Sequence, residues 1–140
     1  MPTPDSLAAY DAALPPEQAA ITQVLRRAFD AALPNATSRV WHRHPVWFIG
    51  ENPVVGYDAR RAAVHVLFWN GQAFEEPGLV PVGKYRAAGT HYAAASDVKL
   101  PTLRRWLKKA RTDVFDGVTY FQALRDAAKA RARTAPKKKR

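Results

Sequence analysis

All four histidines of the chain fall within segments that the sequence predicts to be β-strands: His42, His44, His65 and His91. Residues two apart on a strand point to the same face of a sheet, so His42 and His44 are expected to project together. A third imidazole from a neighbouring strand, His65 or His91, would complete a set that can hold a divalent metal ion with one open coordination position. One hypothesis is therefore a metal site at His42, His44 and His65. The alternative is that each histidine is a surface residue or is hydrogen-bonded in the core.

Aromatic side chains accompany these histidines in the same β-rich region. Trp41 and Trp47 have the opposite parity to His42 and His44, so they are expected on the other face of the strand. Aromatic residues beneath covering helices are usually core residues, but two or three of them could line a cleft for a small apolar ligand or a peptide. The candidates for such a cleft are Trp41, Pro45, Trp47, Tyr57, Trp69, Lys84 and Tyr85.

Positive charge is concentrated at the carboxyl end of the sequence. The net charge is +10, and residues 99–140 hold fourteen basic and three acidic side chains, whereas residues 1–98 hold eight basic and nine acidic ones. A cationic end attracts polyanions by contacting phosphates and releasing counterions. The nucleic-acid candidates are Arg104, Arg105, Lys108, Lys109, Lys137, Lys138, Lys139 and Arg140. The alternative is a solvated helix face followed by a tail that only solubilises the protein.

No convincing catalytic set is present. The chain has no cysteine, which excludes disulfides, thiolate metal sites and cysteine nucleophiles. The segment around Gly83 and Lys84 lacks the glycines of a phosphate-binding loop, and no serine stands in the sharp turn that nucleophilic serines require. We therefore expect a protein without a catalytic residue or a cofactor, and the sequence favours a non-enzymatic role.

Composition is typical of one globular domain. The chain has 140 residues, of which 47% are hydrophobic, and no apolar run approaches the length of a membrane helix. The first residues lack the basic start of a secretory signal, so we expect a cytoplasmic protein that does not associate with membranes, either a monomer or a homodimer. The domain is predicted to span residues 1–133, and residues 134–140 are predicted to form a disordered basic tail.

The spacing of apolar residues predicts helices at both ends of this domain. Asp5 or Ser6 can cap a short helix that ends near Ala13, and a second helix follows Pro15-Pro16 and closes near Leu33. An amphipathic helix begins at Leu100. Asp116 can cap a last helix, whose inward-facing residues are expected to be Val118, Phe121, Leu124 and Ala128.

Short runs rich in β-branched and aromatic residues separate these helices. Strands are predicted over residues 40–49, 54–58, 62–69 and 90–95, with turns at residues 50–53 and 58–61. Such short links join antiparallel neighbours. The predicted fold class is α+β, a small antiparallel sheet of four or five strands packed by amino-terminal and carboxyl-terminal helices.

Several of these motifs resemble the YdhG-like family of domains of unknown function. The similar segments span about residues 5–112 and include Val40-Trp41-His42-Arg43-His44-Pro45-Val46-Trp47-Phe48, Val54-Val55-Gly56-Tyr57, Arg60-Arg61 with Val64-His65-Val66-Leu67-Phe68, and Gly83-Lys84-Tyr85 to Gly89-Thr90. The resemblance implies helices packed on one face of an antiparallel sheet. Some members are described as frataxin-like intracellular iron chaperones, but the carboxylate clusters that a hard iron site requires are missing from the first helices of this chain.

Three functions follow from these patterns. The first is a non-enzymatic binding module with a cleft beside the sheet for a small ligand or a protein segment. The second is a nucleic-acid accessory protein that acts through the basic carboxyl-terminal helices and tail. The third is a metal-binding or iron-chaperone-like protein that uses the strand histidines.

Overall fold

The fold is built on one antiparallel sheet, which a computed structural model of the chain describes together with its helices over residues 5–134. The strands lie in the order β1-β2-β3-β4-β6-β5. Their bounds are β1 Thr37–Trp41, β2 His44–Ile49, β3 Asn52–Arg60, β4 Ala63–Phe68, β5 Val80–Pro81 and β6 Ala88–Tyr92. The predicted α+β class with an antiparallel sheet is confirmed. The sheet has six strands in place of the four or five expected, of which β5 is only two residues long.

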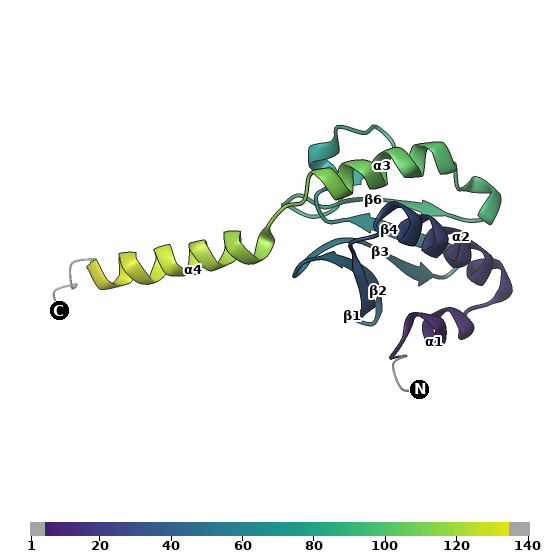
Figure 1. Ribbon diagram of the computed structural model, residues 1–140, viewed down its shortest axis with the longest axis horizontal. Coiled ribbons are helices and arrows are strands. Elements are labelled where there is room, and N and C mark those ends of the chain that lie inside the picture. Colours follow the sequence, from purple (N-terminus) through teal and green to yellow (C-terminus); the bar gives the residue numbers. More distant parts are fainter. Residues whose placement is uncertain (1–4, 135–140) are drawn as a thin grey trace.

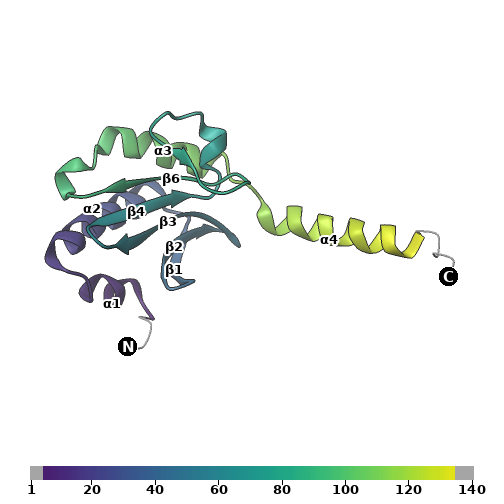
Figure 2. The same cartoon turned by 180° about the vertical axis from the view of Figure 1, so that it is seen from behind.

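Three helices cover one face of this sheet: α1 Leu7–Ala12, α2 Pro16–Ala32 and α3 Leu100–Thr112 (Figure 1). The side chain of Ser6 caps α1 by accepting a hydrogen bond from the backbone N–H of Ala9, and Pro16 stands in the first turn of α2 as predicted. Two short 3-10 helices lie in the connections: η1 Gly71–Phe74 between β4 and β5, and η2 Ala95–Asp97 between β6 and α3. The view from behind shows that no helix within residues 5–134 covers the opposite face, which we call the open face (Figure 2).

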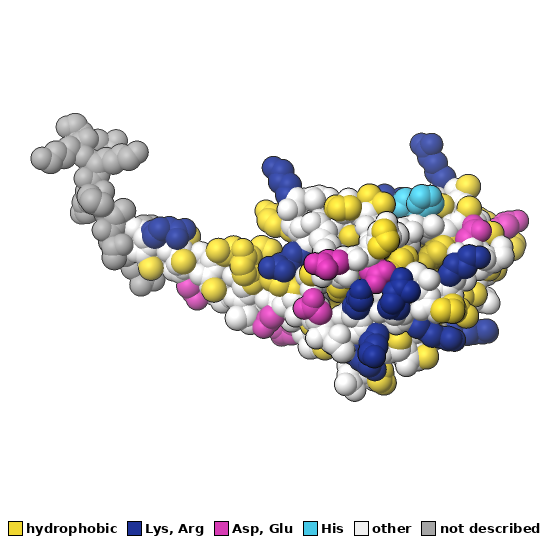
Figure 3. Space-filling model, turned by 90° about the horizontal axis from the view of Figure 1, so that it is seen from above, with side chains coloured by type: hydrophobic (Ala, Val, Ile, Leu, Met, Phe, Trp, Pro, Cys, Tyr) yellow, Lys and Arg dark blue, Asp and Glu magenta, His cyan; other side chains and the backbone are white. Residues whose placement is uncertain are grey.

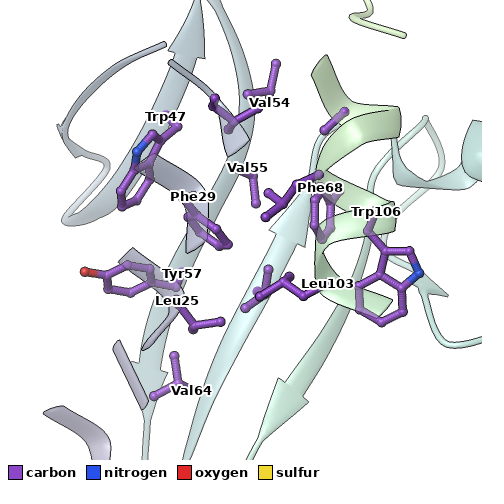
Figure 4. Close-up of a cluster of buried hydrophobic side chains, with 14 of the residues drawn as sticks. Leu25, Phe29, Trp47, Val54, Val55, Tyr57, Val64, Phe68, Leu103 and Trp106 are labelled. Atoms are coloured by element: carbon purple, nitrogen blue, oxygen red, sulfur yellow. The ribbon is translucent and has the colours of Figure 1, made fainter. Parts of the chain in front are cut away.

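The hydrophobic core fills the space between the covered face and the helices. Side chains alternate along a strand, so one parity of β2, β3 and β4 points toward α2 and α3. The core side chains labelled in Figure 4 are Leu25, Phe29, Trp47, Val54, Val55, Tyr57, Val64, Phe68, Leu103 and Trp106. Their polar atoms have partners, because Trp47 donates to Asp30 at 2.8 Å and Tyr57 donates to Asp11 at 2.7 Å.

The region predicted as one strand over residues 40–49 is a hairpin. β1 ends at Trp41 and β2 begins at His44, and the two residues between them have φ values of 51° for His42 and 75° for Arg43. Two residues of positive φ are the conformation of a two-residue turn whose twist matches that of the strands it joins. His42 therefore lies in a turn, and the prediction that His42 and His44 project from one face of a strand is wrong.

The turns on either side of β3 are shorter than predicted. The first occupies Gly50 and Glu51, and the second occupies Arg61 and Ala62, so β3 extends over nine residues. Asn52 and Pro53 are strand residues, although both types are uncommon in strands. Pro53 is the second residue of β3. It is paired with Phe48 of β2, next to a shift in the pairing register.

The last helix, α4 Gly117–Thr134, projects away from the rest of the molecule (Figure 1). Asp116 caps it as predicted, accepting a hydrogen bond from the backbone N–H of Thr119. Its apolar residues do not face inward, because Val118, Phe121 and Leu124 are 44%, 41% and 46% exposed. The predicted packing of this helix against the core is therefore wrong. None of the helices within residues 5–134 has the length and apolar character that a membrane crossing requires.

A charged cluster fastens the loop after η1 to α3. Glu76, whose side chain is 6% exposed, accepts hydrogen bonds from Arg105 at 2.7 and 3.0 Å and from Trp106 at 3.0 Å. Lys109 donates to the same carboxylate at 2.5 Å and to the carbonyl oxygen of Phe74 at 2.9 Å. These donors hold the pKa of Glu76 far below its usual range, and the hydrogen bonds from Arg105 have the largest effect.

We predict that Glu76→Gln lowers the free energy of unfolding by about 2 kcal/mol at pH 7, because hydrogen bonds to a charged group are lost. The lowered pKa of Glu76 stabilises the folded chain above pH 4.5, and this stability is lost as the pH falls below that value. Urea unfolding at several pH values measures both effects. Below pH 4.5, the free energy of unfolding should depend less on pH in the variant than in the wild type. Glu75→Gln is the matched control, since Glu75 is an exposed neighbour. An equal decrease in the free energy of unfolding of the two variants would contradict a stabilising role of the Glu76 cluster.

Candidate functional site

The open face of the sheet holds a pocket of about 430 Å³. It lies over the middle of β3, β4 and β6, and is bordered by β2 and by the segment around β5. The lining residues are His44, Gly56, Tyr57, Asp58, Arg60, His65, Val66, Leu67, Val80, Val82, Gly89, Thr90 and His91. Three imidazoles, four aliphatic side chains and an ion pair between Arg60 and Asp58 at 2.7 Å give it both apolar and polar surface. We call this pocket the histidine cleft.

Two glycines leave the floor of the histidine cleft without side chains. A Cβ atom at Gly56 would lie 2.7 Å from the carbonyl oxygen of Pro45, and one at Gly89 would lie 2.5 Å from that of Val66. Both distances are too short for a real Cβ contact, so neighbouring strands approach closely only because these positions are glycine. Both glycines are buried, so they mark where the strands beneath the cleft approach each other closely.

The cleft brings together histidines from three strands. His65 on β4 is paired in register with His91 on β6, and their rings are stacked with centroids 5.5 Å apart. His44 comes from the start of β2, and its Nδ1 atom is buried without a hydrogen-bond partner among the described residues.

The environment of His65 favours its neutral form. Burial lowers the pKa of His65, and the nearby charges of Arg60 and His91 lower it further, while Asp58 acts in the opposite direction. A neutral imidazole can both donate and accept a hydrogen bond. At neutral pH the cleft therefore offers hydrogen-bonding groups beside apolar walls, with the Arg60–Asp58 pair at one end.

The predicted metal set of His42, His44 and His65 is not brought together. His42 lies in the β1–β2 turn, whereas His44 and His65 line the cleft. Among residues 5–134, no group of three or more histidine, aspartate or glutamate side chains is placed so that it could hold a metal ion. The positive φ at His42 is the physical reason, because it ends the strand that was expected to carry both histidines on one face.

The aromatic candidates do not share one cleft either. Trp47 and Tyr57 are core residues, each 1% exposed, and Tyr57 reaches the cleft only where its strand passes beneath it. Trp41 and Trp69 lie near each other on the open face beside Phe48, with Trp41 centroids 6.1 Å from Trp69 and 5.4 Å from Phe48. The remaining candidates are a buried Pro45 in β2 and the exposed loop residues Lys84 and Tyr85.

The basic candidates on α3 separate into two groups. Arg105 and Lys109 both pair with the single carboxylate of Glu76, which offsets one of their two charges. Arg104 and Lys108, one helical turn apart, point to another side of α3 and line a groove against α2. The other predicted residues, Lys137, Lys138, Lys139 and Arg140, lie outside the described residues. So does the predicted tail of residues 134–140, except for Thr134, which ends α4.

Sequence reasoning missed several residues of the histidine cleft, among them Leu67, Val80 and Val82. A usable signal was the presence of single glycines inside the strand-like runs, at Gly56 and Gly89, since an interior glycine often marks a close approach of backbone or ligand. The sequence offered His65 and His91 only as alternative partners for His42 and His44. Their pairing with each other depends on the register between β4 and a strand that follows a long irregular segment.

No family model, no curated protein and no solved structure matches this chain.

We predict that His65 titrates below pH 6.5 when its imidazole protons are followed by nuclear magnetic resonance. Arg60→Gln should raise the midpoint, because one of the charges that oppose protonation is removed. Arg61→Gln, a neighbouring exposed arginine, should leave it unchanged. Because the folded chain binds this proton less readily than the unfolded chain, His65 should also reduce stability as the pH falls below 6.5. A midpoint above 6.5 would refute the environment described for this ring.

Proposed function

We propose that the protein is a non-enzymatic binding module that holds a small organic ligand in the histidine cleft. The observation that supports this is a pocket of about 430 Å³ on the one sheet face that no helix covers. Its volume is within the range of small-molecule sites, and mostly apolar walls with a few polar groups are typical of such sites.

The lining suggests the chemical class of the ligand. The glycine floor favours a flat molecule, and Leu67, Val80 and Val82 favour an apolar body. The neutral His65 and its stacked partner His91 favour an uncharged group that donates and accepts hydrogen bonds. A planar aromatic amide or heterocycle combines these properties. This class of ligand requires no metal ion and no covalent chemistry.

The resemblance to the YdhG-like family is retained as part of this proposal. It is supported by the arrangement of helices on one face of an antiparallel sheet, which is the architecture that the resemblance implied. The cleft would then be a property of the face that such an architecture leaves uncovered.

We predict that benzamide, an uncharged aromatic amide, shifts the amide signals of Gly56, Leu67 and Gly89 in nuclear magnetic resonance titrations. Leu67→Trp should abolish these shifts, because a half-buried open-face side chain is enlarged to fill the cleft. Ala31→Trp, an exposed substitution on α2, is the control and should leave them unchanged.

Native mass spectrometry of the untagged protein, purified at low salt without chelator, provides a second test. A copurified organic mass that is present in the wild type and in Ala31→Trp but absent in Leu67→Trp would support the proposal. Shifts that spread over the covered face, or that persist in a folded Leu67→Trp variant, would contradict it.

A further inference from the structure

A second hollow lies on the outer surface of the helical layer, between α2 and α3. Its volume is about 610 Å³, and it is lined by Val24, Arg27, Ala28, Ala31, Ala32, Leu100, Arg104, Lys108 and Arg111. It is separated from the histidine cleft by the helices, the core and the sheet. We call it the α2–α3 groove.

The floor of this groove is apolar and made mostly of small side chains. Ala28, Ala31 and Ala32 recur along one side of α2 beside Val24, and Leu100 begins the facing stripe on α3. Small residues allow a further helix to approach closely, as they do where helices pack together. From Leu100 to Arg111 the lining of α3 covers eleven residue steps, which corresponds to about 16 Å at 1.5 Å per residue.

The rim carries positive charge from both helices and no negative charge. Arg27 comes from α2, and Arg104, Lys108 and Arg111 recur along α3 at steps of one turn. No carboxylate lines the groove, and none of these four cations is in an ion pair with any residue described in 5–134. Lys and Arg side chains gather around hydrophobic patches on the face that carries α3 (Figure 3).

The basic residues beside the groove, unlike those on its rim, form ion pairs. Arg105 and Lys109 on the same helix are held by Glu76, and Arg26 on α2 lies 3.5 Å from Asp11. Within residues 5–134, the cations beside the groove therefore have acidic partners, whereas the four on its rim have none. Concentrated like charge costs stability, and an anionic partner would relieve it.

We propose that the α2–α3 groove is a docking site for an acidic amphipathic helix of a partner protein. An apolar stripe on that helix would lie on the alanine floor, and glutamate or aspartate on its two sides would pair with Arg27 and with Arg104, Lys108 and Arg111. A length of about 16 Å fits three helical turns.

Other occupants fit less well. The chain's own α4 carries Arg125, Lys129 and Arg131 against a single acid, Asp126, in its described part, so it would bring like charges to the rim. A nucleic-acid backbone would satisfy the cations but would leave the apolar floor unused, because phosphate recognition relies on charge. This inference is independent of the ligand proposed for the histidine cleft.

The test uses a fluorescent synthetic peptide of about 14 residues, with leucine at helical spacing on one face and glutamate on the others. A peptide of equal composition with the leucines scattered, and a DNA duplex of similar length, serve as comparison probes. Fluorescence anisotropy measures the affinity of each for the full chain at several salt concentrations.

We expect the amphipathic peptide to bind more tightly than the scattered one. The double variant Arg104→Gln/Lys108→Gln should weaken its binding about tenfold, since two ion pairs at the edge of a contact are lost. Ala31→Trp should abolish binding by filling the floor. Arg125→Gln/Lys129→Gln removes the same charge from α4 and should have little effect.

Three outcomes would overturn the proposal. They are equal affinity for the two peptides, no binding of the amphipathic peptide by a folded wild-type chain, and tighter binding of DNA that responds to Arg104→Gln/Lys108→Gln. The last would make the groove a nucleic-acid surface. Circular dichroism melting of each variant establishes that the chain is folded.

Discussion

The packing of α2 and α3 on one face of the sheet determines where both candidate sites can lie. Val64, Val66 and Phe68 on β4 point into the core because that face is covered, and the residues between them, His65 and Leu67, are left on the other face. The histidine cleft is therefore a direct consequence of strand alternation beneath a one-sided helical layer. The groove between the same two helices faces away from the sheet, so the layer that closes the core also forms the second surface.

Local regularities in the sequence were enough to place the helices of the covering layer. Ser6 at the start of α1, Pro16 at the start of α2 and the stripe that begins at Leu100 are signals that act within a few residues. The hairpin between β1 and β2 escaped detection because its turn contains neither glycine nor asparagine. A run from Val40 to Ile49 without those residues looks like one strand.

The candidate site was harder to predict because it depends on contacts between distant segments. Assigning Trp47 and Tyr57 to the core requires knowing which parity the helices cover, and alternation alone does not identify that face. Stacking of His65 on His91 requires the register of β4 against β6, which lie on either side of an irregular segment. The basic residues of α3 could be counted from the sequence. Which of them bind Glu76, and which have no acidic partner among the described residues, is decided only in the folded chain.

The β1–β2 turn also bears on how much change the open face can tolerate. His42 and Arg43 both hold a left-handed backbone conformation, which costs a residue with a side chain about 1 kcal/mol relative to glycine or asparagine. Replacing the two turn residues with an Asn-Gly pair would therefore raise the free energy of unfolding. His42 and Arg43 do not line the cleft, so this gain in stability could offset the destabilisation caused by new side chains at the ligand-binding surface. The cleft could therefore be redesigned for another molecule while a stabilising substitution in the β1–β2 turn of the same sheet offsets the loss of stability.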